Sequence, residues 1–95
     1  MAMLNGSEIL AKALKREGVE ELFFLMGGPM LAAEAATINE GIRCIDVRHE
    51  QAAAMMAQAY SRLRQRPGFC MAASGPATIN LSTGLANALI DCCPV

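Results

Sequence analysis

The stretch LFFLMGGP, residues 22–29, decides the fold. It opens with an uninterrupted apolar run and ends in two glycines and a proline. A short apolar run bounded by turn residues is typical of a strand that is buried on both faces, as in a parallel sheet covered by helices. We therefore predict a buried strand over residues 22–26.

Helix and strand patterns alternate on both sides of this strand. Asn5 or Ser7 can cap a leading helix, with Glu8 placed to complete a capping box on Asn5. After the leading helix, the alternation predicts a three-layer α/β/α fold, a parallel sheet with helices on both faces. The predicted segments that follow the leading helix are the strand 22–26, a helix 29–39, a strand 42–47, a helix from 49 that ends before Pro67-Gly68, a strand 69–73 and a helix from 76 to about 90.

The helix that begins near residue 49 shows the clearest apolar periodicity. We expect its apolar stripe to face the core. We also expect Cys44, Cys70 and Cys92 to be reduced thiols in apolar surroundings. Gly18, Gly41 and Gly68 are interpreted as ordinary turn residues. The stripe consists of Ala52, Met55, Met56, Ala59, Tyr60 and Leu63.

Composition limits the classes of function. The 95 residues suffice for one domain at most, and a net charge of -1 provides no basic surface for nucleic acid. No apolar stretch is long enough for a membrane span or a secretory signal, so we expect a cytoplasmic protein. One histidine and four dispersed or adjacent cysteines give no metal site. With 54% hydrophobic residues, part of the apolar surface is expected to meet another surface.

The sequence ends at residues 91–95, where the pattern places the start of another buried strand. We therefore interpret the fold as truncated, with a sheet edge that further sequence or a partner chain covers.

Ligands of such sheets gather at the carboxyl ends of the strands. Three loops are predicted at that edge, residues 26–28, 47–50 and 73–76. Gly27, Gly28 and Gly75 would let the backbone approach a flat or anionic ligand. The phosphate-binding patterns G-x-G-x-x-G and G-x-x-x-x-G-K-[ST] are absent, so a dinucleotide or nucleoside triphosphate is not indicated.

Glu50 is the carboxylate best placed for chemistry, where a strand gives way to a helix. From position alone, stabilisation of the helix N-terminus explains it better than catalysis, because the helix dipole favours an ionised carboxylate there. His49 has no partner for a catalytic triad and is interpreted either as structural or as a support for a residue that binds the ligand.

Three motifs in order resemble the thiamine-diphosphate enzymes, a family that includes acetolactate synthase, oxalyl-CoA decarboxylase and 2-hydroxyacyl-CoA lyase. Residues 48–62, RHEQAAAMMAQAYSR, resemble R-H-E-x-x-A-x-x-M-A-x-x-Y-A-R. Residues 74–80, SGPATIN, resemble S-G-P-G-x-x-N, and residues 87–95 resemble the A-x-A-x-x-D-x-x-P-V that follows. The resemblance extends over essentially the whole chain and implies the N-terminal part of the pyrimidine-binding domain, without the central and diphosphate-binding domains.

The resemblance implies a role for Glu50. In the family the matching glutamate hydrogen-bonds the aminopyrimidine ring and lets the cofactor, thiamine diphosphate, lose the proton of its thiazolium carbon. An apolar site covered by the cofactor would have to raise the pKa of this carboxyl against the helix dipole. By the same resemblance Ser74, Pro76 and Asn80 bind near the pyrimidine. The loop of Met26, Gly27 and Gly28 would face the substrate.

The sequence departs from the family pattern at two places, with residues 23–29 replacing V-F-G-x-P-G and Ala77 replacing a glycine. The family motif for Mg²⁺ and diphosphate, G-D-G followed by N-N, is absent, so the Mg²⁺ ligands are expected outside this sequence. The resemblance implies a homodimer or homotetramer. It also implies a lyase or carboligase that acts beside a carbonyl, on a 2-oxo acid or an acyl-CoA. The alternative is a non-catalytic pyrimidine-type module that only assembles with a partner chain.

Overall fold

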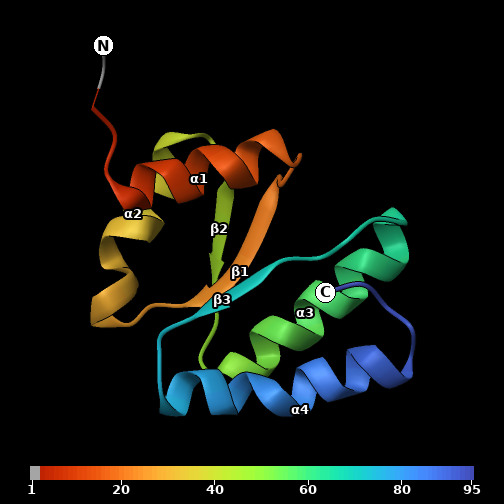
Figure 1. Cartoon of the computed structure of the whole chain (residues 1–95). Coiled ribbons are helices and arrows are strands. Elements are labelled where there is room, and N and C mark those ends of the chain that lie inside the picture. Colours follow the sequence, from red (N-terminus) through yellow and green to blue (C-terminus); the bar gives the residue numbers. More distant parts are fainter. Residues whose placement is uncertain (1–2) are drawn as a thin grey trace.

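The computed structural model describes residues 3–95, and it shows a three-stranded parallel sheet with helices on both faces (Figure 1). The strand order is β2-β1-β3. This arrangement confirms the predicted α/β/α fold class and the alternation of strands and helices. The elements are α1 (Gly6–Arg16), β1 (Glu21–Leu25), the 3₁₀ turn η1 (Gly28–Met30), α2 (Leu31–Asn39), β2 (Arg43–Asp46), α3 (Glu50–Arg64), β3 (Cys70–Ala72) and α4 (Pro76–Ile90).

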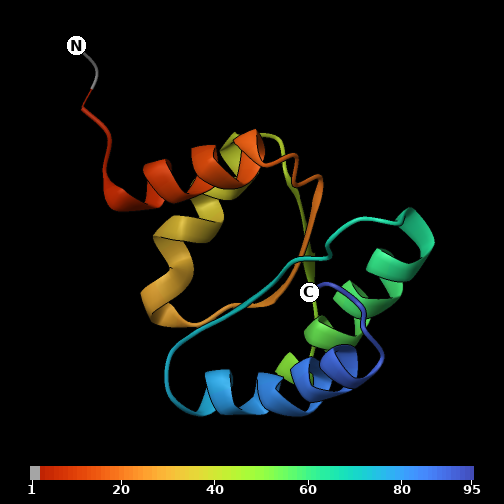
Figure 2. The same ribbon diagram turned by 45° about the vertical axis from the view of Figure 1, so that its right-hand side comes forward.

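The central strand β1 separates two layers of helices. Figure 2 shows α1 and α2 on one side of the sheet, and α3 and α4 on the other. Leu22 packs with Ile42 in the cluster that receives Leu14 of α1, whereas its neighbour Phe23 packs with Ala53 of α3. Successive β1 side chains therefore serve opposite faces, which explains why the strand sequence is apolar throughout.

The N-terminal capping box forms as predicted. The backbone N–H of Asn5 donates to Glu8 Oε2 at 2.8 Å, and the N–H of Glu8 donates to Asn5 Oδ1 at 2.9 Å. At the next helix the structure differs slightly, because Pro29 lies in the 3₁₀ turn and α2 begins only at Leu31. Proline fits this tight turn since it lacks the N–H that a helix start leaves unpaired.

The apolar stripe predicted for α3 was wrong for its two methionines and its leucine. Met55, Met56 and Leu63 are 40%, 38% and 84% exposed. The buried face is built of small and polar residues because α4 packs closely against it: a Cβ added at Gly84 would lie 2.5 Å from the Cβ of Ala54. Of the other predicted members, Ala52 and Tyr60 pack against the core and Ala59 is exposed. The buried residues of α3 are Glu50, Ala53, Ala54, Ala57, Gln58 and Ser61.

Two smaller predictions also need correction. Gly68 is not an ordinary turn residue, because a Cβ at this position would overlap the backbone carbonyl of Ala57. Cys92 is exposed and adopts a left-handed φ of 55°, whereas Cys44 and Cys70 are half-buried as expected for thiols near the core. Cys92 lies in the turn that follows α4, so its side chain does not join the core.

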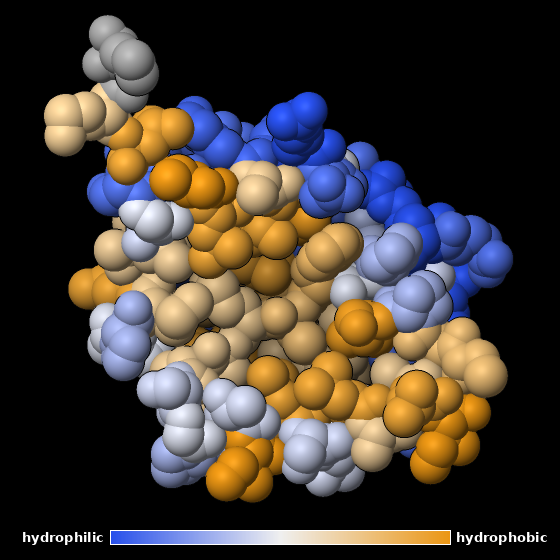
Figure 3. Space-filling model, in the orientation of Figure 1, coloured by the Kyte–Doolittle hydropathy of each residue, from blue (hydrophilic) through white to orange (hydrophobic). Residues whose placement is uncertain are grey.

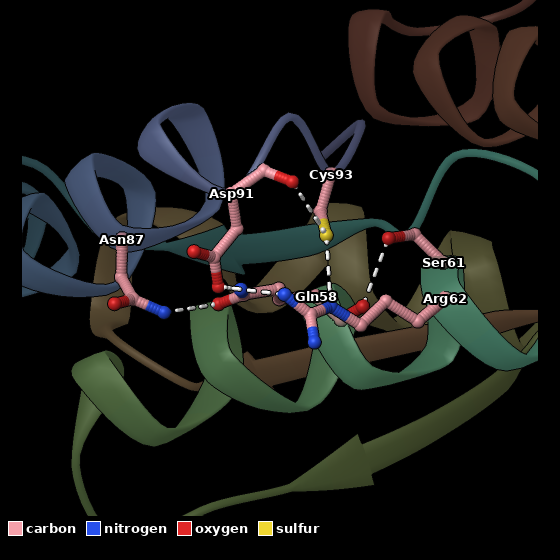
Figure 4. A network of polar contacts seen from close by, with 6 residues as sticks. All are labelled: Gln58, Ser61, Arg62, Asn87, Asp91 and Cys93. Atoms are coloured by element: carbon pink, nitrogen blue, oxygen red, sulfur yellow. Dashed lines mark hydrogen bonds and ion pairs between the residues drawn. The ribbon is translucent and has the colours of Figure 1, made fainter.

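Residues 91–95 form a turn and an irregular segment instead of the predicted strand. The segment runs back toward β3, where the N–H of Gly68 donates to the carbonyl oxygen of Pro94 at 3.0 Å. A network of polar side chains holds the end of α4 against α3 (Figure 4). In it, Gln58 Nε2 and Arg62 Nη2 both donate to Asp91 Oδ2, at 2.7 and 2.8 Å.

Large apolar side chains remain on the surface of α4. Figure 3 shows apolar residues gathered over the lower part of the molecule, where Figure 1 places α4. Ile79, Leu89 and Ile90 are 71%, 80% and 81% exposed. Among the described residues, no helix is both long and apolar enough to span a membrane.

Candidate functional site at the carboxyl edge of the sheet

The three predicted loops meet at one edge of the sheet because β1, β2 and β3 are parallel. The loops after β1 and β3 touch: a Cβ on Gly27 would overlap the Cβ of Ala73, so only glycine permits this approach. The hydroxyl of Thr78 donates to the carbonyl oxygen of Ala73 at 2.8 Å and fixes the first turn of α4 to the end of β3. On the β3 side the edge is therefore held in place by a close approach of two loops and by a side-chain hydrogen bond.

Glu50 is the first residue of α3 and lies at this edge, with 9% of its surface exposed. His49 caps the helix, because its Nδ1 accepts a hydrogen bond from the N–H of Gln51 at 3.1 Å. The structural role predicted for His49 is thus confirmed. Asn80 of α4 donates from Nδ2 to Glu50 Oε2 at 3.0 Å. The residues that follow β2 and β3, the two strands flanking β1, therefore converge on one carboxylate.

The pKa of Glu50 is lowered from its ordinary value of 4.5. The largest cause is the hydrogen bond from its own backbone N–H, and the second is the Asn80 amide; partial burial acts in the opposite direction, and His49 lowers the pKa further. The direction agrees with the ionised state that the helix N-terminus predicts. It is opposite to the raised pKa expected of a cofactor-covered site, because burial by the chain's own atoms is the weaker influence.

The other predicted site residues are more exposed. Ser74 and Pro76 lie on the surface where α4 begins, with Pro76 in its first turn. In the substrate-facing loop Met26 is 51% exposed and Gly28 is also on the surface. Of the predicted set, Asn80 is the residue that hydrogen-bonds Glu50. These positions share the carboxyl edge, as the sequence predicted.

Sequence reasoning missed two residues that shape the site. Thr78 anchors α4 to β3, and Gly84 lets α4 approach α3 closely enough for the contact between Asn80 and Glu50. A glycine in the middle of a helical pattern was the available signal for Gly84, because glycine there costs stability unless a close approach requires it. Thr78 gave no signal distinct from an ordinary helix residue.

The residues of this edge fit an aminopyrimidine ring. A carboxyl group accepts a hydrogen bond from a ring N–H when it is ionised and donates one to a ring nitrogen when it is protonated. The Asn80 amide engages only Oε2 of Glu50. A Cβ added at Gly28 or Gly75 would meet no atom within 4 Å, so a flat ring can lie directly against the backbone there. Within residues 3–95 no cluster of three or more His, Cys, Asp or Glu side chains is suited to a metal ion. The fold and site define an α/β domain with a nearly buried carboxylate at the carboxyl edge of its sheet, the edge at which such sheets bind ligands.

A separate hollow of about 380 Å³ lies between α1 and α2. Leu4, Lys12 and Asn39 are among its lining residues, and none of the predicted site residues lines it. Its walls come from the helix layer on the opposite side of the sheet from α3, so the hollow is separate from Glu50.

Comparison with known proteins identifies the family. The family model described as thiamine pyrophosphate enzyme, N-terminal TPP binding domain, matches residues 4–95. Acetolactate synthase from Arabidopsis thaliana chloroplasts is 43% identical over 92 residues, which cover 96% of this chain and 14% of that protein. The large subunit of acetolactate synthase isozyme 2 from Escherichia coli (strain K12) is 41% identical, over 97% of this chain and 17% of that protein. Human 2-hydroxyacyl-CoA lyase 1 is 39% identical, over 97% of this chain and 16% of that protein.

The chain therefore belongs to the thiamine pyrophosphate enzyme family and corresponds to its N-terminal cofactor-binding domain. It spans about one sixth of the length of the curated relatives it matches. The resemblance seen in the sequence motifs is confirmed at the level of the family.

Proposed function

We propose that this segment supplies the activating glutamate, Glu50, to a thiamine-diphosphate-dependent lyase or carboligase that makes or breaks a bond beside a carbonyl. The observation that carries the proposal is the placement of Glu50: a 9%-exposed carboxylate at the carboxyl edge of the sheet, in a chain of this family. Thiamine diphosphate supplies the carbanion chemistry when it is bound.

In this proposal Glu50 exchanges the proton, and the residues around it hold the carboxyl group and the ring in position. Glu50 holds its carboxylate at the edge through the first turn of α3, and His49 fixes that turn as its cap. The glycine backbone at Gly27 and Gly28 permits close approach of a ring and of the substrate that reacts beside it. Ser74 and Pro76 would line the ring from the start of α4. Each of these assignments rests on position at the edge.

Two substrate classes follow from the relatives. The similarity to acetolactate synthases supports a 2-oxo acid as the substrate of this protein, and the similarity to 2-hydroxyacyl-CoA lyase supports an acyl-CoA. The Met26 loop departs from the family pattern where it would face the substrate, so it is the part of this segment expected to influence the choice.

We further propose that these residues form the first part of a pyrimidine-binding domain in a longer protein. Its other domains would hold Mg²⁺ and the diphosphate, and the active form would be a homodimer or homotetramer. The large apolar side chains that α4 leaves exposed, Ile79, Leu89 and Ile90, support a further packing surface.

The test replaces Glu50 by Gln in the whole protein that carries these residues. Turnover of a 2-oxo acid and of a 2-hydroxyacyl-CoA is measured, together with thiamine diphosphate affinity by calorimetry. We expect kcat to fall by about 10²- to 10⁴-fold, the usual contribution of one acid-base group, with cofactor affinity changed much less.

Glu8→Gln is the matched control, because Glu8 also lies in the first turn of a helix but belongs to the capping box of α1. It removes the same charge away from the carboxyl edge and should leave kcat unchanged. Full activity of the Glu50→Gln protein would refute the proposed role, whereas the non-catalytic assembly module predicts no turnover to lose in either protein.

A further inference from the structure

The hydrogen bond between Asn80 and Glu50 joins two helices at the candidate site. Asn80 Nδ2 lies 3.0 Å from Glu50 Oε2, and the two residues are thirty positions apart in sequence. An amide NH₂ group can only donate, so it stabilises an oxygen that accepts, as a carboxylate oxygen does. The contact therefore distinguishes the two oxygens of Glu50, because Oε2 is held and Oε1 is not held by this amide.

The position of the Asn80 amide is fixed by how α4 packs on α3. Asn80, Gly84 and Asn87 recur at helical spacing and face α3. Gly84 allows the close approach to Ala54, and Asn87 Nδ2 donates to Gln58 Oε1 at 2.8 Å. Near β3, the hydroxyl bond of Thr78 anchors the first turn of α4.

A second group of contacts fixes the C-terminal end of α4 against α3. Asp91 accepts hydrogen bonds from Gln58 and from Arg62, and Figure 4 shows these side chains pointing toward one another between the two helices. The helix pair is thus held at both ends, and Asn80 cannot shift relative to Glu50 without breaking contacts along α4.

We propose that Asn80 is a positioning residue for Glu50: it binds Oε2 throughout the reaction, so that Glu50 accepts and returns its proton at Oε1. This inference rests on the proposed function and revises the assignment of Asn80 as a direct ligand of the pyrimidine. The proton that Oε1 would receive comes from the bound aminopyrimidine ring and returns to it, so no other reactant is required.

Few charged groups surround this carboxyl. His49 adjoins it on its own helix, and the nearby Asp46 is paired with Arg48 at 2.8 Å, with the Arg48 side chain 88% exposed. Neither β3 nor α4 contains a charged side chain, and the only carboxylate of β1, Glu21, lies at the far end of that strand. Asn80 is therefore the polar group from the neighbouring elements that acts on Glu50, consistent with its lowering of the Glu50 pKa.

The test measures proton linkage in the whole protein with Asn80 replaced by Ala or Asp. Calorimetry of thiamine diphosphate binding in buffers of different ionisation enthalpy gives the protons taken up per cofactor at each pH, and steady-state kinetics gives the pH profile of kcat/KM. For Asn80→Ala we expect the acid limb of both profiles to move up by about one pH unit, because a hydrogen bond to a charged group is lost.

Asn80→Asp has nearly the same shape but places a second carboxylate beside Glu50. We expect its acid limb to move further up than that of Asn80→Ala, since like charges disfavour ionisation. Because aspartate fills the same space as asparagine, this variant still tests the positioning role if the alanine variant does not fold. An acid limb unchanged in Asn80→Asp overturns the proposal.

Asn87→Ala is the matched control, because it removes an amide from the same face of α4 that bonds Gln58 and not Glu50. It should lower stability and leave the acid limb in place; an equal shift in this control would make the effect of Asn80 merely structural and overturn the proposal. If Asn80→Ala instead weakens cofactor affinity with no change in pH profile, Asn80 contacts the ring and the positioning role is wrong. Full activity of Glu50→Gln would refute the proposed function itself, so the two failures are distinguishable.

Discussion

Replacing Gly84 by Ala tests whether the close packing of α3 and α4 holds the site. By helix propensity alone the substitution should stabilise α4 by about 1 kcal/mol. The added Cβ, however, would lie 2.5 Å from the Cβ of Ala54 and 3.0 Å from the backbone oxygen of Gln51. Neither neighbour is the end of a flexible side chain, so the helices must separate. Overpacking of this kind costs about 1–3 kcal/mol, and we expect a net destabilisation of about 1–2 kcal/mol.

The assay is the midpoint of urea unfolding, read at constant m, for the single variants and for a double-mutant cycle. Ala54→Gly removes the Cβ that Gly84→Ala would meet, so the double variant should show a favourable coupling of about 1 kcal/mol or more. Gly6→Ala is the control in α1, because a Cβ there meets nothing within 4 Å. A Gly84→Ala protein that is more stable than the parent, with no coupling to Ala54, would refute the close-packing argument.

Three further predictions follow from the described contacts. Cys92 should react with a thiol reagent before Cys44 and Cys70, because Cys92 is exposed whereas burial raises the pKa of the other two thiols. Cysteine mapping by mass spectrometry checks the order, and equal rates at the three positions would contradict it. The lowered pKa of Glu50 contributes stability that is present above pH 4.5 and is lost as the pH falls through the pKa of the folded protein. Glu50→Gln should therefore flatten the acid side of the profile of stability against pH, measured without cofactor. Parallel profiles for the variant and the parent would count against this prediction. Asn5→Ala should cost about 1 kcal/mol through loss of the capping box, seen as a lower urea midpoint, and an unchanged midpoint would show that the box contributes nothing.

Local chemistry determined most of the fold in advance. The capping pair of Asn5 and Glu8, the apolar run of β1 and the proline at the start of α4 each acts within a few residues, so the sequence alone predicts the element. Parallel strands place their carboxyl ends together, so the sequence alone predicts that Glu50 and the glycine loops share one edge of the sheet.

The failures arose where a long-range contact outweighs periodicity. Met55 and Met56 fit an amphipathic stripe, yet α3 buries Ala54 and Gln58 instead, because α4 packs too closely for large side chains. That approach depends on Gly84, thirty residues further along the chain than Ala54. The Asn80 amide adds to the lowering of the Glu50 pKa, and no pattern along the chain could identify Glu50 as its partner.

The most direct test of the proposed role of Glu50 is the rate of deuterium exchange at the thiazolium carbon of thiamine diphosphate bound to the whole protein. This rate reports proton loss from the cofactor without any substrate. The proposed role predicts exchange about 10²- to 10⁴-fold slower in Glu50→Gln, and unchanged in Glu8→Gln, with the cofactor bound in both. Parental exchange in the Glu50→Gln protein with cofactor bound would contradict it.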